Sequence, residues 1–229
     1  MPGQRILESL RFWWRNLAAL LLVTAPFAIA GEFVQWWLGP ALEETDEQQI
    51  AVNAAGALAL LALRPFLEGA VIGQLSAIQS GRARGLGDCL LFSLRVAPWL
   101  VPVYLLVLSL SYAGLLLFIL PGVWIYSRLC LAPFITCLEG RAPLDALRQS
   151  VERTRGNQQW IIFVTVAMTG IMVLFALLLC ASLLQQTVGD NQTTGVLLAI
   201  LTALGGALIS VLVFRFHVLS APGDGPQPD

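Results

Sequence analysis

The sequence of 229 residues contains no lysine, a single histidine and four cysteines, and only 12% of its residues are charged. An ordinary soluble domain has about a quarter of its residues charged, so this composition excludes a water-facing surface around a core of this size. The net charge of −1 at pH 7 gives no basic excess that would bind nucleic acid. The few histidines and cysteines show no metal-ligand spacing, so we expect no metal and no other cofactor.

Apolar residues make up 57% of the chain and gather in six long runs. A helix that crosses a bilayer needs about 20 mostly apolar residues, because each adds about 1.5 Å towards a hydrocarbon layer of about 30 Å. We therefore predict an all-α, polytopic membrane protein with six transmembrane helices. The predicted spans are residues 17–38, 50–80, 96–120, 121–138, 160–184 and 195–214.

The third and fourth spans are separated only by Leu120-Pro121-Gly122. Proline cannot donate a hydrogen bond to the preceding helix, and glycine tolerates a sharp reversal, so we predict a tight helical hairpin here. The alternative is one kinked helix about 64 Å long, which is twice the thickness of the hydrocarbon layer. Pairing the other spans in the same way gives three hairpins.

The distribution of arginine predicts the orientation. Eleven arginines lie in the terminal and connecting segments on one side, whereas the other side carries acidic residues only, among them Glu43, Glu44 and Asp190. Because positively charged segments stay in the cytoplasm, we expect a multi-pass protein of the bacterial inner (plasma) membrane with both termini cytoplasmic. None of the four cysteines then lies in an oxidising compartment, and we expect no disulfide.

The amino-terminal segment has a second interpretation. Three arginines, an apolar run and Ala28-Ile29-Ala30 resemble a secretory signal with its cleavage site. The apolar character continues to Leu38, which favours an uncleaved first span. Cleavage stays open as the alternative.

A short segment with helical periodicity precedes each predicted hairpin. Apolar residues recur on one face of each segment: Ile6, Leu10 and Trp13, then Leu86, Leu90 and Leu94, then Leu144, Leu147 and Val151. An apolar stripe with flanking arginines suits the headgroup plane, so we predict three cytoplasmic interfacial amphipathic helices. The arginines expected to contact headgroups are Arg11, Arg15, Arg82, Arg84, Arg141, Arg148, Arg153 and Arg155.

The second and third of these segments resemble one another. Each begins with Gly-Arg-Ala, followed by an aspartate and a serine five residues apart. This similarity suggests repeats at residues 1–80, 81–138 and 139–218 within a single six-helix domain, with chance similarity in a biased sequence as the alternative. Residues 219–229 have no apolar periodicity, and we expect a disordered cytoplasmic tail.

Four charged residues fall inside predicted spans: Glu32, Arg64, Glu68 and Arg128. Such residues must face protein or water, and Arg64 and Glu68 share one helix face because they are four residues apart. One hypothesis is a polar centre that binds an anionic group. The other, which we favour, is a buried network that fixes helix pairing.

Small residues spaced by four occur on the second and sixth spans. These stripes allow close helix packing, either within the bundle or between two copies of the chain, and we favour packing within the bundle. Their members are Gly69, Gly73 and Ala77, and Thr202, Gly206 and Ser210.

Six short motifs are spread along nearly the whole chain. They are Phe12-Trp13-Trp14-Arg15-Asn16, Leu120-Pro121-Gly122, Leu131-Ala132-Pro133, Ala146-Leu147-Arg148-Gln149-Ser150, Thr154 to Asn157, and Phe214-Arg215-Phe216. In these motifs the chain resembles the YciC-like family of uncharacterised bacterial inner-membrane proteins. The resemblance implies a polytopic inner-membrane protein and transfers no catalytic residue.

The leading functional hypothesis is a non-enzymatic membrane protein that acts in the cell envelope through contacts with membrane lipids or other membrane proteins. The rival is a small transporter or channel for an anion or a lipid headgroup that uses Arg64, Glu68 and Arg128. A membrane-embedded lipid enzyme is disfavoured because the sequence has no nucleophile beside a histidine. The lone histidine, His217, lies just after the sixth span.

Overall fold

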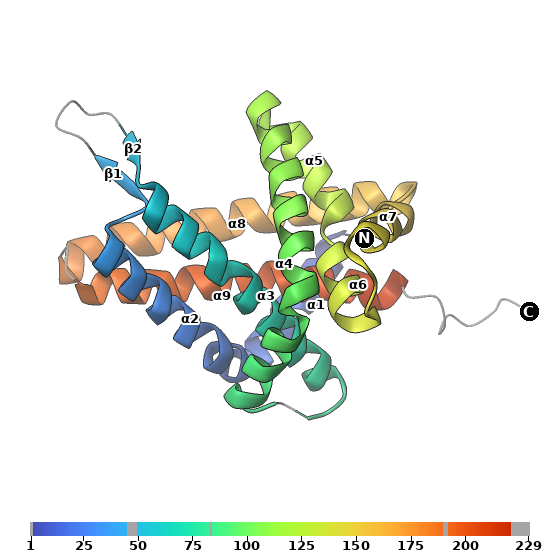
Figure 1. Ribbon diagram of the computed structural model, residues 1–229, viewed down its shortest axis with the longest axis horizontal. Coiled ribbons are helices and arrows are strands. Elements are labelled where there is room, and N and C mark those ends of the chain that lie inside the picture. The colour runs from blue at the N-terminus through green and yellow to red at the C-terminus, as the bar shows by residue number, and fades with distance from the viewer. Residues whose placement is uncertain (1, 45–49, 83, 190–191, 221–229) are drawn as a thin grey trace, which may run out of the picture. The chain divides into compact units, whose positions relative to one another are not determined.

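The computed structural model describes residues 2–44, 50–82, 84–189 and 192–220 and is almost entirely helical there (Figure 1). Six helical stretches of 20 to 32 residues are long and apolar enough to cross a membrane. This confirms the prediction of six membrane-spanning helices by length and composition. The helices are α1 (Pro2–Arg15), α2 (Leu17–Leu38), α3 (Ala54–Gln79), α4 (Leu86–Leu117), α5 (Ile119–Leu129), α6 (Ala132–Glu139), α7 (Pro143–Arg153), α8 (Asn157–Val188) and α9 (Gln192–Ser220).

The connection between α2 and α3 contains two strands that the sequence analysis did not foresee. Strands β1 (Leu42–Glu44) and β2 (Ile50–Val52) pair antiparallel, so the second span begins at Ala54 and not at residue 50. Asn53 closes this connection, because its side-chain nitrogen donates to the Leu38 carbonyl at 2.6 Å and its oxygen accepts from the Gly56 N–H at 3.3 Å. The second bond caps the first turn of α3.

Helix α4 begins at Leu86, ten residues before the predicted start of the third span. The segment predicted as a separate interfacial helix is therefore continuous with the third span in the structure. This segment packs on α3, where the Ser93 hydroxyl donates to the Phe66 carbonyl at 2.6 Å. A Cβ atom added at Gly73 would lie 2.6 Å from the Phe92 ring, so this glycine of the predicted small-residue stripe is used for packing within the chain.

The α4–α5 pair is a tight hairpin whose turn consists of the extended residue Phe118. The turn thus lies just before the predicted Leu120-Pro121-Gly122, and Pro121 sits in the first turn of α5, where its missing N–H costs nothing. The backbones approach closely, since a Cβ atom added at Gly114 would lie 2.8 Å from the Gly122 Cα. This contact excludes the alternative of one long kinked helix.

The fourth predicted span is broken in its middle. Helix α5 ends at Leu129 and α6 begins at Ala132, with Pro133 in its first turn. Helix α6 ends at Glu139 and is followed by Gly140, which adopts a left-handed conformation with φ of 66°. Helix α7 then packs against both α5 and α6.

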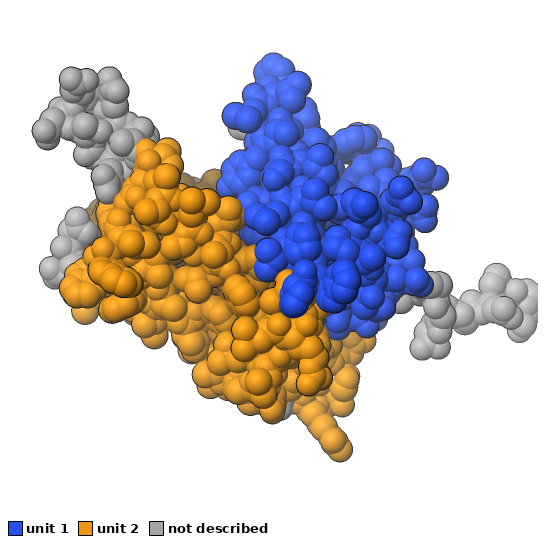
Figure 2. Space-filling view, in the orientation of Figure 1, with its two compact units in different colours: residues 1–14, 98–170, 208–229 blue, residues 15–97, 171–207 orange. Residues whose placement is uncertain are grey.

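Contacts divide the described chain into two compact units, each assembled from segments distant in sequence (Figure 2). Unit 1 comprises residues 1–14, 98–170 and 208–229, and unit 2 comprises residues 15–97 and 171–207. The core of unit 1 includes Leu131 and Phe134 of α6, and the core of unit 2 includes Ile72 of α3. The predicted single domain, the three repeats and the three-hairpin arrangement stay predictions, and the predicted tail lies mostly outside the described residues.

Candidate functional site

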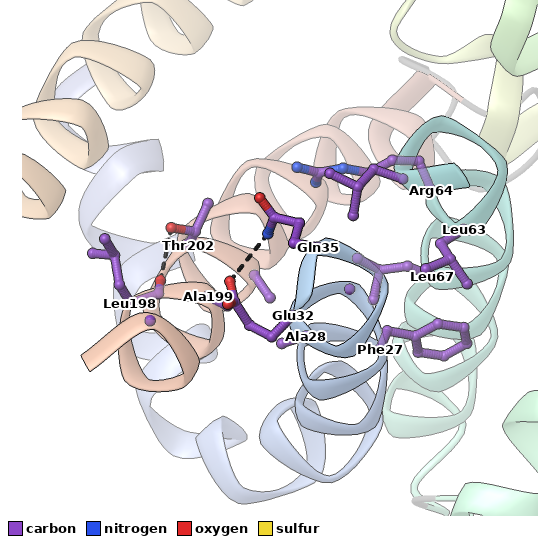
Figure 3. Close-up of a pocket in the computed structure, with 14 residues that line it drawn as sticks. Phe27, Ala28, Glu32, Gln35, Leu63, Arg64, Leu67, Leu198, Ala199 and Thr202 are labelled. Carbon is purple, nitrogen blue, oxygen red and sulfur yellow. Dashed lines mark hydrogen bonds between the residues drawn. The ribbon is translucent and has the colours of Figure 1, made fainter. Parts of the chain in front are cut away.

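Two of the four charged residues predicted inside spans, Glu32 and Arg64, line one cavity in unit 2. The cavity has a volume of about 300 Å³ and lies between α2, α3 and α9 (Figure 3). Ten of its fourteen lining residues are apolar, and Gln35 and Thr202 are the other polar members. The cavity therefore combines an apolar wall with one acid, one base and two neutral polar groups.

The acidic end of the cavity is built around Glu32. The side-chain nitrogen of Gln35 donates to Glu32 Oε1 at 3.2 Å. The other carboxylate oxygen faces α9, where a Cβ atom added at Gly195 would lie 3.1 Å away. The Thr202 hydroxyl donates to the Leu198 carbonyl at 2.8 Å and keeps its acceptor lone pairs. Glu32 Oε2 thus approaches α9 because residue 195 has no side chain.

Helix geometry explains why the acid and the base face the same space. Glu32 lies about 9 Å before the end of α2, and Arg64 about 15 Å after the start of α3, at a rise of 1.5 Å per residue. Side chains lean towards the amino end of their own helix. Helices α2 and α3 are antiparallel neighbours, so the Glu32 and Arg64 side chains lean towards the same height along the helix pair. Figure 3 shows Gln35 between them in this view.

Arg64 is the basic residue of the cavity. Within the described residues its guanidinium forms no hydrogen bond or ion pair, with Glu32 or with any other group. An arginine at mid-span opposes membrane insertion by about 2.5 to 3.5 kcal/mol. Arg64 is exposed, so its guanidinium is open to an anion or to water. Glu68 lies one turn further along α3, outside the cavity lining, and takes part in an interaction of its own.

Arg128 belongs to unit 1, where neighbouring elements hold it. Its Nη2 donates to Gln159 Oε1 at 3.0 Å, and its guanidinium lies over the Trp124 ring at 5.2 Å. Its carbonyl accepts from the Ser150 hydroxyl of α7 at 2.6 Å. Arg128 precedes the helix break at residues 130–131, so it contacts the segment that joins the fourth and fifth spans. If the fourth span were one straight helix, Arg128 would lie near its middle.

A second polar cluster joins α6, α7 and α9 within unit 1. Arg153 makes a bidentate ion pair with Glu139, at 2.6 and 2.8 Å, and the Arg153 side chain is only 11% exposed. His217 Nε2 lies 3.6 Å from Glu139 Oε1. This cluster links the end of α7 to α6 and to the last turns of α9.

The eight arginines expected to contact headgroups fall into two groups. Arg84 and Arg153 are half-buried and have partners, since Arg84 lies over the Phe92 ring at 5.0 Å and Arg153 binds Glu139. The remaining six are exposed: Arg11, Arg15, Arg82, Arg141, Arg148 and Arg155.

Sequence reasoning missed three glutamines that organise these sites. Gln35 binds Glu32, Gln159 binds Arg128, and the fully buried Gln74 accepts from the Arg84 N–H at 3.2 Å. They carry no charge, so the pattern of charged residues does not reveal them. Their signal is an amide inside or at the edge of an apolar run, where it must find a partner.

Comparison with known proteins places the chain in a broad class. It is 28% identical to UPF0259 membrane proteins of Yersinia pestis and Yersinia pseudotuberculosis over 181 residues, which cover 78% of this chain and 69% of each relative. No family model and no solved structure matches. The likeness to an uncharacterised membrane family, together with the six apolar helices, identifies a multi-pass membrane protein. The YciC-like name stays a prediction.

Proposed function

We propose that this multi-pass membrane protein is non-enzymatic and acts at the bacterial inner membrane through contacts of its arginine-rich cytoplasmic face with anionic lipids. In this proposal the six spans pair as three hairpins, both termini are cytoplasmic, and α1 and α7 lie in the headgroup plane. Protein partners would bind the same face.

The observation that supports the proposal is the way α7 packs. Its small residues Ala146 and Ser150 are fully buried against unit 1. Leu144 on another face is 64% exposed, and Arg141 and Arg148 beside it are exposed as well. An exposed apolar residue flanked by exposed arginines is typical of a helix that lies at a lipid surface. Arg153 has a different role here, because it holds α7 to α6.

The test replaces the exposed arginines and leaves the ion-paired one in place. The variant R141Q/R148Q/R155Q is purified in mild detergent, and the phosphatidylglycerol and cardiolipin that co-purify are quantified. Each basic residue near an anionic surface contributes about 1 kcal/mol, so we expect a clear loss of anionic lipid. The matched variant R141K/R148K/R155K keeps the charges and should keep the lipid. Unchanged anionic lipid in the glutamine variant contradicts the proposal.

The orientation has its own test. Topology reporters fused after Glu47 and after Arg155 should report opposite compartments, with the second in the cytoplasm. The same compartment for both fusions contradicts the six-span arrangement.

The rival hypothesis, transport of an anion or a lipid headgroup, is favoured by the cavity that contains Arg64. Arg128 already has Gln159 and Trp124 as partners, so the cavity is the stronger part of this hypothesis. Flux into liposomes that is lost in R64Q supports transport. Flux that survives when Arg64, Glu68 and Arg128 are all neutralised refutes their role.

A further inference from the structure

We propose that the unit 2 cavity binds one zwitterionic phospholipid whose headgroup carries a primary ammonium group, as in phosphatidylethanolamine. The proposal is independent of the cytoplasmic arginine contacts, because it involves other residues and another part of the chain.

Charge complementarity identifies the headgroup. The cavity holds one cation and one anion, Arg64 and Glu32, which do not pair with one another in the described chain. A guanidinium binds phosphate through two parallel hydrogen bonds. A carboxylate accepts from a primary ammonium group, and Gln35 occupies only one of the two Glu32 oxygens. A phosphoethanolamine headgroup supplies both partners in one molecule.

The apolar wall indicates that the ligand is a lipid and not a free ion. Phe27, Leu60, Leu63 and Leu67 line the cavity beside Arg64, and burying their surface against acyl chains is favourable. A volume of about 300 Å³ accommodates a headgroup and the first methylene groups, while the rest of the chains stays in the bilayer. A free phosphate would leave this wall uncovered.

Gly195 is the cavity residue of α9 that lies next to the Glu32 carboxylate. A side chain at this position would press on Glu32 Oε2, at 3.1 Å from the added Cβ atom. Glycine at this position therefore lets the oxygen that the Gln35 amide does not bind lie close to the α9 backbone.

The test measures lipid binding by native mass spectrometry of the purified full chain in detergent. Phosphatidylethanolamine, phosphatidylglycerol and phosphatidylcholine are added at matched concentrations. We expect one tightly bound phosphatidylethanolamine, with weaker binding of phosphatidylglycerol, which lacks the ammonium, and of phosphatidylcholine, which lacks its N–H donors. R64Q should weaken phosphatidylethanolamine binding about 10- to 100-fold, as expected for the loss of a charge-assisted hydrogen bond to phosphate.

Specificity provides a readout that a merely structural role would not change. E32Q should shift the preference from phosphatidylethanolamine towards phosphatidylglycerol, because it removes the partner of the ammonium and the repulsion of an anionic headgroup. G195A should weaken phosphatidylethanolamine binding without a change of charge. E152Q is the matched control, since Glu152 is exposed on α7 and lies outside the cavity lining, and it should bind as the wild type does.

Three results would overturn the proposal. They are equal binding of phosphatidylethanolamine and phosphatidylglycerol by the wild type, an unchanged preference in a monodisperse E32Q protein, and equally strong competition by soluble phosphoethanolamine, which would remove the lipid from the argument. R141Q/R148Q/R155Q should retain the tightly bound phosphatidylethanolamine. Failure of the cytoplasmic contacts and failure of the cavity are therefore distinguishable.

Discussion

The close approach of α4 and α5 predicts that a single methyl group at Gly122 destabilises the protein. A Cβ atom added there would lie 2.4 Å from Leu115 Cγ and 2.8 Å from the Leu115 backbone nitrogen. The Leu115 side chain can rotate away, but the backbone nitrogen moves only if the two helices separate. The G122A substitution therefore disturbs the hairpin itself.

The magnitude follows from two opposing effects. Overpacking a well-packed contact costs about 1 to 3 kcal/mol, whereas alanine in place of a helical glycine stabilises by about 0.5 to 1 kcal/mol. We expect a net loss of about 1 to 2 kcal/mol for G122A. Gly170 in α8 is the matched control, because an added Cβ atom there meets nothing within 4 Å. Only the favourable effect then operates, so G170A should be neutral or stabilising.

The assay is equilibrium unfolding of the purified protein in mixed micelles of mild detergent and dodecyl sulfate, followed by tryptophan fluorescence. The reasoning predicts opposite signs for the two glycine-to-alanine variants. If G122A is as stable as G170A, or more stable, the α4–α5 contact is not as close as the glycine geometry requires.

Two further predictions concern unit 1. A double-mutant cycle of R153Q and E139Q in the same unfolding assay should give a coupling free energy of about 1 to 2 kcal/mol, because the ion pair is bidentate and partly buried. The more exposed Arg215–Glu8 pair should give less than about 1 kcal/mol. Cys130 is 3% exposed, so N-ethylmaleimide should label it at least about tenfold more slowly than Cys180 of α8, which is half-buried. Equal labelling rates would show that Cys130 is accessible.

The sequence predicted the spans well because their physical cause is local. A run of about 20 apolar residues is long enough for the bilayer whatever the rest of the chain does, and α2 begins and ends at the predicted residues, Leu17 and Leu38. The boundaries that differ depend on partners distant in sequence. Asn53 caps the start of α3 by accepting from the Gly56 N–H and also donates to the Leu38 carbonyl at the end of α2, and the sequence of the span alone does not reveal this second contact.

Part of the candidate site could be predicted from the sequence, because a charge inside an apolar run is a local signal. Composition alone identified Glu32 and Arg64 as costly charges, and the structure brings both to one cavity. It could not identify Gly195, whose contribution is the absence of a side chain next to a carboxylate on another helix. It also could not separate Arg128 from Arg64, because Arg128 contacts Gln159 and Ser150, which are distant in sequence.

The two arginines show how one sequence signal covers two physical situations. An arginine inside an apolar run must be compensated, and the compensation comes either from the protein or from something the protein binds. Arg128 is compensated from within, by the Gln159 amide and the Trp124 ring, so its replacement should mainly change stability. Arg64 has no such partner in the described chain, although a carboxylate lines the same cavity. A chain under selection for stability alone would pair these two charges, and keeping them apart is physically reasonable when a ligand with both signs of charge enters between them.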